Sequence, residues 1–490
     1  MAANRRAFLK SAGMGTLGAS LACDTASDGS RPDARPNIIF IFSDQQRWDT
    51  VDCYRDTPIL ADPSSSFEIT PNLNRMAAEG VRFQNAFTCQ PVCGPARACL
   101  QTGRYASEVG CQTNNRRLPP DATTMAHRLS AGGYEVGYIG KWHLASCGER
   151  GGPDDFKTKP VPPDRRGGYD DFWLASDVLE FTSHSYDGHM FDAGMNRRDF
   201  PPGRYRVDAQ TDWVLEYLES RTLERPFFLF LSYIEPHHQN DHNHYEGPEG
   251  SEELFGNFAV PGDLLDTEGD WRAEYPDYLG CIHSLDKNLG RIRDTLSKLG
   301  IADNTLLLYT SDHGSHFRTR NAEYKRSCHD GCIHIPMLAC GPGFEGGTVV
   351  RDLVSLIDIP PTILAGAGLD IPADFRGTPL QPVARGDTSD RPDDVFLQIS
   401  ESHCGRALRT HRWKYSVRAL DAGPSDAFAE RYAEDFLYDL DADPYERNNL
   451  VADPAYGQVR EEMKERLLRR MASGGEPACT ILPNSLTDDS

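Results

Sequence analysis

The residues of this chain that are best arranged for chemistry lie between Cys93 and Arg104. Pro95 has the fixed φ that suits a first helical turn, and Gly103 can end the helix in the left-handed conformation. Cys93 would then lie at the helix N-terminus, where unpaired backbone N–H groups and the dipole stabilise an anion and favour a thiolate. The pattern predicts a helix that presents Cys93 as a nucleophile. The alternative is a buried structural cysteine.

Polar residues also follow four separate apolar runs. Residues 37–43, 135–140, 226–234 and 305–310 are continuous hydrophobic stretches, which are typical of buried parallel strands. They run into Asp44 and Gln45, into Lys141 and His143, into His237 and His238, and into Asp312 and His313. Because ligands bind beyond the carboxyl ends of the strands in open α/β sheets, we expect these side chains to form one site.

The elements that must position these residues alternate between strand and helix. Amphipathic helices are expected over residues 70–78, 207–221 and 278–299. This alternation predicts an α/β fold with a mostly parallel central sheet and helices on both faces. Residues 149–206 and 238–274 are rich in Gly, Pro, Asp and Tyr, and we expect them to form long insertions over the strand ends.

A smaller unit is expected after a polar, turn-rich boundary near residues 382–394. Short strands are predicted over residues 395–399, 406–410, 413–417 and 436–440, and a charged helix over residues 456–471. These elements predict a smaller C-terminal antiparallel sheet subdomain. The chain would then divide into an export signal and linker over residues 1–34, a main domain over residues 35–384 and the subdomain over residues 385–490.

The motif around Cys93 resembles that of a known enzyme family. Cys93-x-Pro95-x-Arg97, followed by Thr102-Gly103-Arg104, resembles the signature of the type I, formylglycine-dependent sulfatases of the alkaline-phosphatase-like superfamily, with Ala96 in place of the common Ser. Residues 140–144 match the Gly-Lys-Trp-His-Leu stretch of that family, and residues 438–450 resemble its closing pattern. The resemblance implies a sulfuric ester hydrolase whose Cys93 is oxidised to formylglycine by a formylglycine-generating enzyme.

The resemblance also implies roles for individual residues. A metal and Arg97 would hold the hydrated aldehyde, and Asp312 would help to deprotonate it. Lys141 and Lys325 would offset the charge of the sulfuryl group, as Lys325 lies five residues before Asp330 where the family has Glu. His237, with Lys325, would protonate the leaving alcohol, and His143 would take the proton that lets the aldehyde reform.

The polar strand ends indicate a metal site. Asp44, Asp312 and the side-chain oxygen of Gln45 are hard ligands that suit calcium or magnesium, while His313 adds an imidazole that manganese or zinc would accept. The modified Cys93 would complete the set. The family usually has a second Asp where this chain has Gln45, which lowers the ligand charge. We expect Ca²⁺, with Mg²⁺ or Mn²⁺ as alternatives.

Composition and the N-terminal residues restrict the partners and the cellular location that we expect for the protein. A net charge of −22 argues against nucleic acid as a partner, and no apolar stretch is long enough for an ordinary membrane span. Arg5, Arg6 and the following Phe-Leu-Lys, with an apolar run to Cys23, resemble a twin-arginine export signal. We expect export to a bacterial periplasm or the medium, and a lipoprotein anchor at Cys23 is an alternative.

The substrate is less constrained by the sequence. His316 and Arg318 follow the predicted Asp312 strand and could bind a second anionic group of the substrate. Aromatic residues in the insertions could stack on sugar rings or pack in the core: Tyr169, Trp173, Tyr186, Tyr245 and Trp271. A sulfated carbohydrate is favoured over a simple aryl sulfate. The alternatives are a phosphonate or phosphate ester hydrolase of the same superfamily and a non-catalytic binding protein.

Overall fold

A computed structural model describes residues 35–55, 68–222, 224–389 and 391–484. The twin-arginine motif and Cys23 lie outside these residues. The larger sheet has ten strands in the order β10-β2-β9-β8-β1-β7-β3-β4-β5-β6. Their bounds are β1 (Asn37–Ser43), β2 (Val81–Phe87), β3 (Glu135–Lys141), β4 (Phe172–Ser176), β5 (His189–Asp192), β6 (Arg197–Asp199), β7 (Phe227–Ser232), β8 (Thr305–Ser311), β9 (Met337–Cys340) and β10 (Thr348–Ser355).

The four strands predicted from continuous apolar runs lie side by side in the sheet. β1 pairs in parallel with β8 on one side and with β7 on the other, and β7 pairs in parallel with β3. Every residue of β1, β7 and β8 is buried, because helices cover both faces of the sheet. The carboxyl ends of the four strands therefore meet at one edge, as expected.

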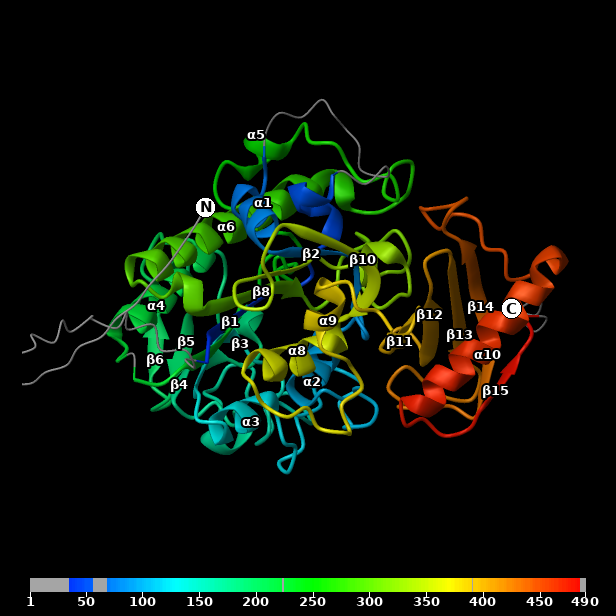
Figure 1. The fold of residues 1–490 in the computed structure, drawn as a ribbon. Coiled ribbons are helices and arrows are strands. Elements are labelled where there is room, and N and C mark those ends of the chain that lie inside the picture. Colours follow the sequence, from blue (N-terminus) through cyan, green and yellow to red (C-terminus); the bar gives the residue numbers. More distant parts are fainter. Residues whose placement is uncertain (1–34, 56–67, 223, 390, 485–490) are drawn as a thin grey trace, which may run out of the picture. The chain divides into compact units, whose positions relative to one another are not determined.

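Helices lie on both sides of the larger sheet (Figure 1), and one hydrophobic core fills each face of this sheet. Along β1, Phe40 and Phe42 point into one core and Ile39 and Ile41 into the other, as the two-residue period of a strand requires. The first core also contains residues of α2 (Cys93–Thr102), α3 (Met125–Ala131), α8 (Ile359–Gly366) and α9 (Leu380–Ala384). The second contains residues of α1 (Pro71–Glu79), α4 (Arg206–Ser220) and α6 (Trp271–Lys298). The predicted α/β architecture is confirmed.

Two expectations about individual elements were wrong. Helix α6 begins at Trp271 instead of residue 278, and Pro276 lies within it. Packing explains the extension, because Trp271, Tyr275 and Tyr278 are buried in a cluster with Phe317. Residues 149–206 are more than surface insertions, since they supply β4, β5 and β6 to the edge of the sheet.

A separate five-stranded sheet follows in the C-terminal part of the chain. It has the order β11 (Val395–Ile399), β12 (Gly405–Arg409), β13 (Trp413–Ala419), β14 (Arg431–Asp439) and β15 (Thr480–Leu482), and α10 (Gly457–Ser473) packs on it. The pairs from β11 to β14 are antiparallel as predicted, whereas β15 pairs in parallel with β14. The division of the chain at residue 385 stays a prediction. In the described part, none of the helices combines the length and apolar character that a membrane span needs.

A buried ion pair ties the C-terminal segment to this sheet. Arg406 on β12 donates to Glu476 at 2.6 Å, and the two side chains are 2% and 1% exposed. Arg406→Met should lower the free energy of unfolding by about 3–5 kcal/mol, because it leaves a buried carboxylate without a cation. Urea unfolding would measure the loss. Adding Glu476→Gln should restore most of the lost free energy of unfolding, because a glutamine at this position can still accept from Gln398. A double variant as unstable as the single variant would contradict this explanation.

Candidate active site

The edge where the four parallel strands end holds a compact polar group. Asp44 follows β1, Lys141 ends β3, His237 follows β7, and Asp312 and His313 follow β8. Cys93 enters from α2, with its Sγ 3.3 Å from Asp44 Oδ1 and 3.3 Å from His313 Nε2. The Nζ of Lys325 lies 2.9 Å from the same sulfur. The structure therefore brings the predicted residues from five separate segments around Cys93.

The helix that carries Cys93 begins and ends as the motif predicts. Its first residue is Cys93, and Gly103 ends it in the left-handed region with a φ of 69°. A side chain at residue 103 would also collide with the ring of Phe375. The expected thiolate is not supported, because burial and then the charge of Asp44 raise the pKa of the Cys93 thiol. The loss of water around the sulfur destabilises the thiolate more than the helix N-terminus stabilises it.

Asp44, Cys93, Asp312 and His313 are arranged as a metal site would require. All four are buried, and each offers a ligand atom within 4.8 Å of the others. The Nδ1 of His313 donates to the carbonyl of Gly314 at 2.8 Å, so its Nε2 carries the lone pair and faces the sulfur and the two acids. Two carboxylates and an unprotonated imidazole nitrogen in one buried place fit a divalent cation.

Orphaned oxygen atoms support the same assignment. Asp312 Oδ2 and Gln45 Oε1 are buried and accept no hydrogen bond. The amide nitrogen of Gln45 donates to the hydroxyls of Tyr245 and Ser315, which turns its oxygen away from them. A buried oxygen without a donor is costly, and coordination to a cation would satisfy both atoms. These residues fit the predicted metal, while the identity of the ion stays a prediction.

The charges of the site make metal removal testable by pH. Burial, and then the charge of Asp44, raise the pKa of Asp312 from 3.8 to about 7. Such a carboxyl favours folding while it is protonated, so its contribution is full below pH 3.8 and is lost as the pH rises through about 7. Metal-depleted protein should therefore have a lower free energy of unfolding at about pH 8 than at about pH 6. Denaturant titrations would measure this, and a difference that persists in Asp312→Asn would assign it to another group.

Asp44 is held by two buried cations on its other side. Lys141 Nζ and Arg97 Nη2 lie 2.9 and 3.0 Å from Asp44 Oδ2. Although burial opposes it, Lys141 and the other cations hold the pKa of Asp44 well below its usual range. Arg97 also donates to the carbonyl of Lys141 and to Ser232. Its contacts orient Asp44 and the end of β3, and its role at the hydrated aldehyde stays a prediction.

Three further predicted residues complete the inner wall. The Nδ1 of His237 donates to the carbonyl of His238 at 2.7 Å, so its Nε2 accepts from Lys325 at 3.1 Å. Burial, followed by the charges of Lys141 and Lys325, lowers the pKa of His237, which keeps this ring neutral in the free site. His143 faces the same space, and its buried Nδ1 has no hydrogen-bond partner.

These groups open into a pocket of about 330 Å³. Cys93, His143, His237 and Lys325 lie among its lining residues, and so does Arg318, whose contact with a second anionic group stays a prediction. His238, expected with His237 at the end of its strand, lines the pocket as well. The pocket also contains residues that the sequence did not point to: Asn114, Glu180, Asn240, Asn243, Ala322, Glu323, Tyr324 and Arg326. Glu180 carried no signal in the sequence, because it lies four residues beyond β4 and the acid that directly follows this strand is Asp177. Glu180 pairs with Lys141 at 3.2 Å.

Other predicted substrate contacts lie elsewhere. His316 is buried behind the pocket and bonds to the carbonyl of Lys325 at 3.1 Å. Of the aromatic candidates, Tyr169, Trp173, Tyr245 and Trp271 are core residues, and Tyr186 packs on Tyr205. Tyr324 is the aromatic side chain that lines the pocket among the described residues.

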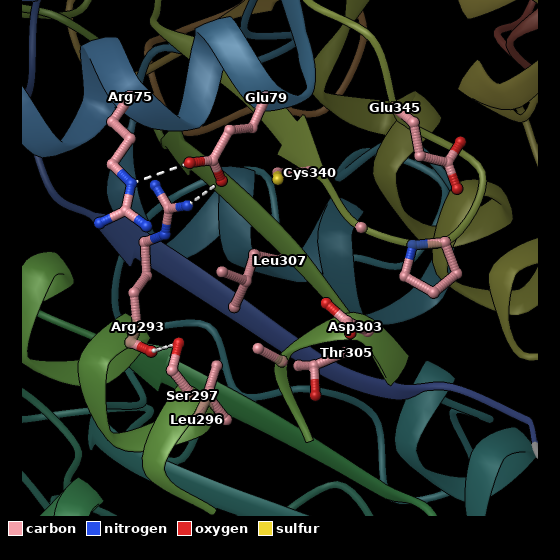
Figure 2. Close-up of a pocket in the computed structure, with 13 residues that line it drawn as sticks. Arg75, Glu79, Arg293, Leu296, Ser297, Asp303, Thr305, Leu307, Cys340 and Glu345 are labelled. Atoms are coloured by element: carbon pink, nitrogen blue, oxygen red, sulfur yellow. Dashed lines mark hydrogen bonds and ion pairs between the residues drawn. The ribbon is translucent and has the colours of Figure 1, made fainter. Parts of the chain in front are cut away.

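A larger pocket of about 460 Å³ lies at the opposite end of β8, beside Thr305 (Figure 2). Its arginines, Arg75 and Arg293, both pair with Glu79, the first at 2.8 Å. The described residues around it include no histidine, whereas several histidines gather at the Cys93 end.

Comparisons with known proteins agree with this geometry. A family model described as Sulfatase matches residues 36–369, and one described as N-sulphoglucosamine sulphohydrolase, C-terminal, matches residues 322–473. The chain is 28% identical to an ulvan-active sulfatase of Formosa agariphila, over 90% of this chain and 82% of that protein. It is 26% identical to an N-acetylglucosamine-6-O-sulfatase of Bacteroides thetaiotaomicron, over 88% and 86% of the two chains. A solved structure described in complex with its substrate D-glucosamine-2-N,6-O-disulfate shares the fold, with a TM-score of 0.73 and 23% identity over 90% of this chain and 98% of that one.

Proposed function

The chain belongs to the sulfatase family of sulfuric ester hydrolases, and from this premise we propose that it cleaves a sulfate ester of a carbohydrate with a formylglycine made from Cys93. The observation that carries the proposal is the surrounding of the Cys93 sulfur. Asp44, His313 and Lys325 all lie within 3.3 Å of it, at the inner end of the pocket. In the mature protein the Sγ position stands for an oxygen of the hydrated aldehyde, and that hydrate supplies two hydroxyls, one to attack sulfur and one to release sulfate.

The metal would be held by Asp44, Gln45, Asp312 and His313, and it would supply positive charge beside the nucleophile and the sulfuryl oxygens. Asp312 would be a ligand of this metal beside Cys93, and its carboxylate can also help to remove the proton of the attacking hydroxyl. Lys325 Nζ, 2.9 Å from the sulfur position, offsets negative charge on the transferred group. Lys141 acts from behind, through its ion pairs with Asp44 and Glu180.

Proton transfer at the two ends of the reaction falls to the histidines. The leaving alcohol takes its proton from the pair of His237 and Lys325, whose nitrogen atoms lie 3.1 Å apart. His143 has an unpartnered Nδ1 in the same pocket and can accept the proton whose loss lets the aldehyde reform. Neutral histidine suits this second role, and burial followed by the charge of Lys141 lowers the pKa of His143.

The rim of the pocket favours a sugar as the group that carries the sulfate. Asn114, Asn240 and Asn243 offer amides that can donate to and accept from hydroxyls, and Tyr324 offers a ring face. Two of the relatives described above are sulfatases named for carbohydrate substrates. Arg318 is available for a second anionic group, although it already pairs with Asp270 at 3.3 Å.

Peptide mass spectrometry and a substrate panel test the proposal. Active protein should carry an aldehyde in place of the Cys93 thiol, and it should hydrolyse sulfated oligosaccharides faster than phosphate or phosphonate esters. Preferred turnover of phosphorus esters would move the function to the related hydrolases. An intact thiol after production with a formylglycine-generating enzyme, together with no turnover, would favour a binding protein.

His237→Ala should separate substrates by their leaving groups. A sugar alcohol needs a proton to depart, whereas a nitrophenolate leaves without one, so the loss in kcat/KM on a sugar sulfate should exceed that on nitrophenyl sulfate by about 10²–10⁴-fold. Steady-state kinetics on both substrates would measure the ratio. His238→Ala is the matched control, because this neighbouring ring lines the pocket without contacting Lys325. Equal losses on both substrates would mean that His237 binds the sulfate, and Lys325 would become the favoured acid.

Export is part of the proposal as well. Arg5 and Arg6, followed by Phe8, Leu9 and Lys10, support a twin-arginine signal, which transports folded proteins. Replacing both arginines by lysine should leave the protein in the cytoplasm. Cell fractionation would detect the change, with another protein exported through the twin-arginine pathway as the control.

A further inference from the structure

Outside the active site, two imidazoles and a carboxylate come together on the surface. His184 belongs to the segment after β4, whereas Asp241 and His242 belong to the segment after β7. Each of the three side chains offers a ligand atom within 4.8 Å of the others. The rings of His184 and His242 are stacked, with centroids 4.3 Å apart and planes 9° apart. His184 Nε2 lies 2.9 Å from Asp241 Oδ2.

The outer nitrogen of each ring is bonded to a second carboxylate. His184 Nδ1 lies 3.2 Å from Asp187 Oδ1, and His242 Nδ1 contacts Glu246 Oε1. A histidine that binds a metal through one ring nitrogen almost always donates from the other to such a partner, which fixes its tautomer and raises its basicity. Both rings of this surface group already have that partner at Nδ1, and the ion would replace the proton that His184 Nε2 shares with Asp241 Oδ2.

From this arrangement we propose that His184, Asp241 and His242 bind a zinc ion, separate from the metal site beside Cys93. Two imidazoles and one carboxylate are a ligand set of zinc, and the fourth position would be filled by water. Ligand atoms of a tetrahedral zinc site lie about 3.3 Å apart, because the bonds are 2.0–2.1 Å long. One of the two stacked rings must turn so that both lone pairs point at the same ion. The side chains of Asp241 and His242 are 58% and 47% exposed, which leaves room for this rotation.

The ion would join the two segments that wall the active-site pocket. Each segment also contributes lining residues to the pocket. One is Glu180, four residues before His184, and the others lie on both sides of Asp241 and His242 in the chain: His237, His238, Asn240 and Asn243. Gln239 already bridges the two segments, with its Nε2 3.1 Å from the carbonyl of Glu180 and 2.7 Å from Asp241 Oδ1. Zinc bound to both segments would replace the hydrogen bond between His184 and Asp241 by a stronger link, so zinc would hold the mouth of the pocket in one arrangement.

Calorimetric titration of the full-length protein with ZnCl₂, in an excess of Ca²⁺ that fills any site for that ion, tests the assignment. We expect one zinc per chain with a Kd of about 1 µM or below. The His184→Ala, His242→Ala double variant should lose this binding, and Asp187→Asn should weaken it by about 10–100-fold. The matched control is His244→Ala, which removes a histidine of the same segment and similar exposure that pairs with Glu274.

Three results would overturn the proposal. Zinc that binds only above about 100 µM would be adventitious. Equal binding by the double variant and the wild type, or loss of binding in His244→Ala alone, would place the ion elsewhere. Limited proteolysis tests separately whether zinc holds the two segments together. Zinc should slow cleavage within residues 179–189 and 237–246 of the wild type and leave the rate of cleavage of the double variant unchanged. Equal cleavage of the wild type with and without zinc would mean that zinc does not hold the two segments together.

Discussion

Cys93→Ala is expected to lower kcat by about 10⁶-fold, which is the scale of loss when a covalent nucleophile is removed. Asp44, His313 and Lys325 surround the Cys93 sulfur at distances of 2.9 to 3.3 Å, so truncation removes the one atom on which they converge. The fold should survive, because the change deletes a single atom at the first residue of α2. Steady-state turnover of a sulfate ester, with circular dichroism and denaturant unfolding, would measure both effects.

Cys99→Ala is the matched control for this variant. Cys99 lies on the same helix and is equally buried, but it packs with Cys89 in the hydrophobic cluster beneath the smaller sheet. Its replacement should change stability by roughly 1 kcal/mol and leave kcat within a few-fold of the wild type. If Cys93→Ala kept more than about 1% of wild-type kcat, the reaction would not pass through this side chain.

Asp312→Asn should cause the second large loss, removing metal and activity together. The substitution keeps the shape of the side chain but takes one negative charge from a site whose other acid, Asp44, is already paired with Lys141 and Arg97. We expect metal affinity to fall by more than about 100-fold, since even outer partners of a metal site contribute 10–100-fold. Elemental analysis after dialysis, with kcat/KM on sugar and nitrophenyl sulfates, would test this, and both substrates should be affected alike.

A stability measurement distinguishes loss of a ligand from general damage. In metal-free protein, Asp312→Asn should not lower the free energy of unfolding, because it removes one of two buried carboxyls that repel each other. Asp286→Asn is the control, as this buried carboxylate accepts from the backbone of Asn72 and Leu73 far from Cys93 and should leave metal content unchanged. Full retention of metal in Asp312→Asn would move the metal site away from Asp312.

Local features of the chain predicted the parts of the site that lie at the ends of regular elements. The apolar runs before Asp44, Lys141, His237 and Asp312 are long enough to identify buried strands without an alignment. Parallel pairing then brings their carboxyl ends together, so position after a strand was sufficient to select these residues. Pro95 and Gly103 likewise determine where α2 begins and ends, because both act through their own backbone conformation.

Features that depend on packing between distant segments were decided by the tertiary structure. Burial raises the pKa of Cys93 against the effect of the helix N-terminus, Arg97 turns toward Asp44, and the aromatic residues of the insertions fill the core. Glu180 reaches Lys141 only because β4 lies beside β3. The physical reason is the same in each case: solvation, charge and contact of a side chain depend on neighbours far away in the sequence, whereas strand and helix signals are carried by residues a few positions apart.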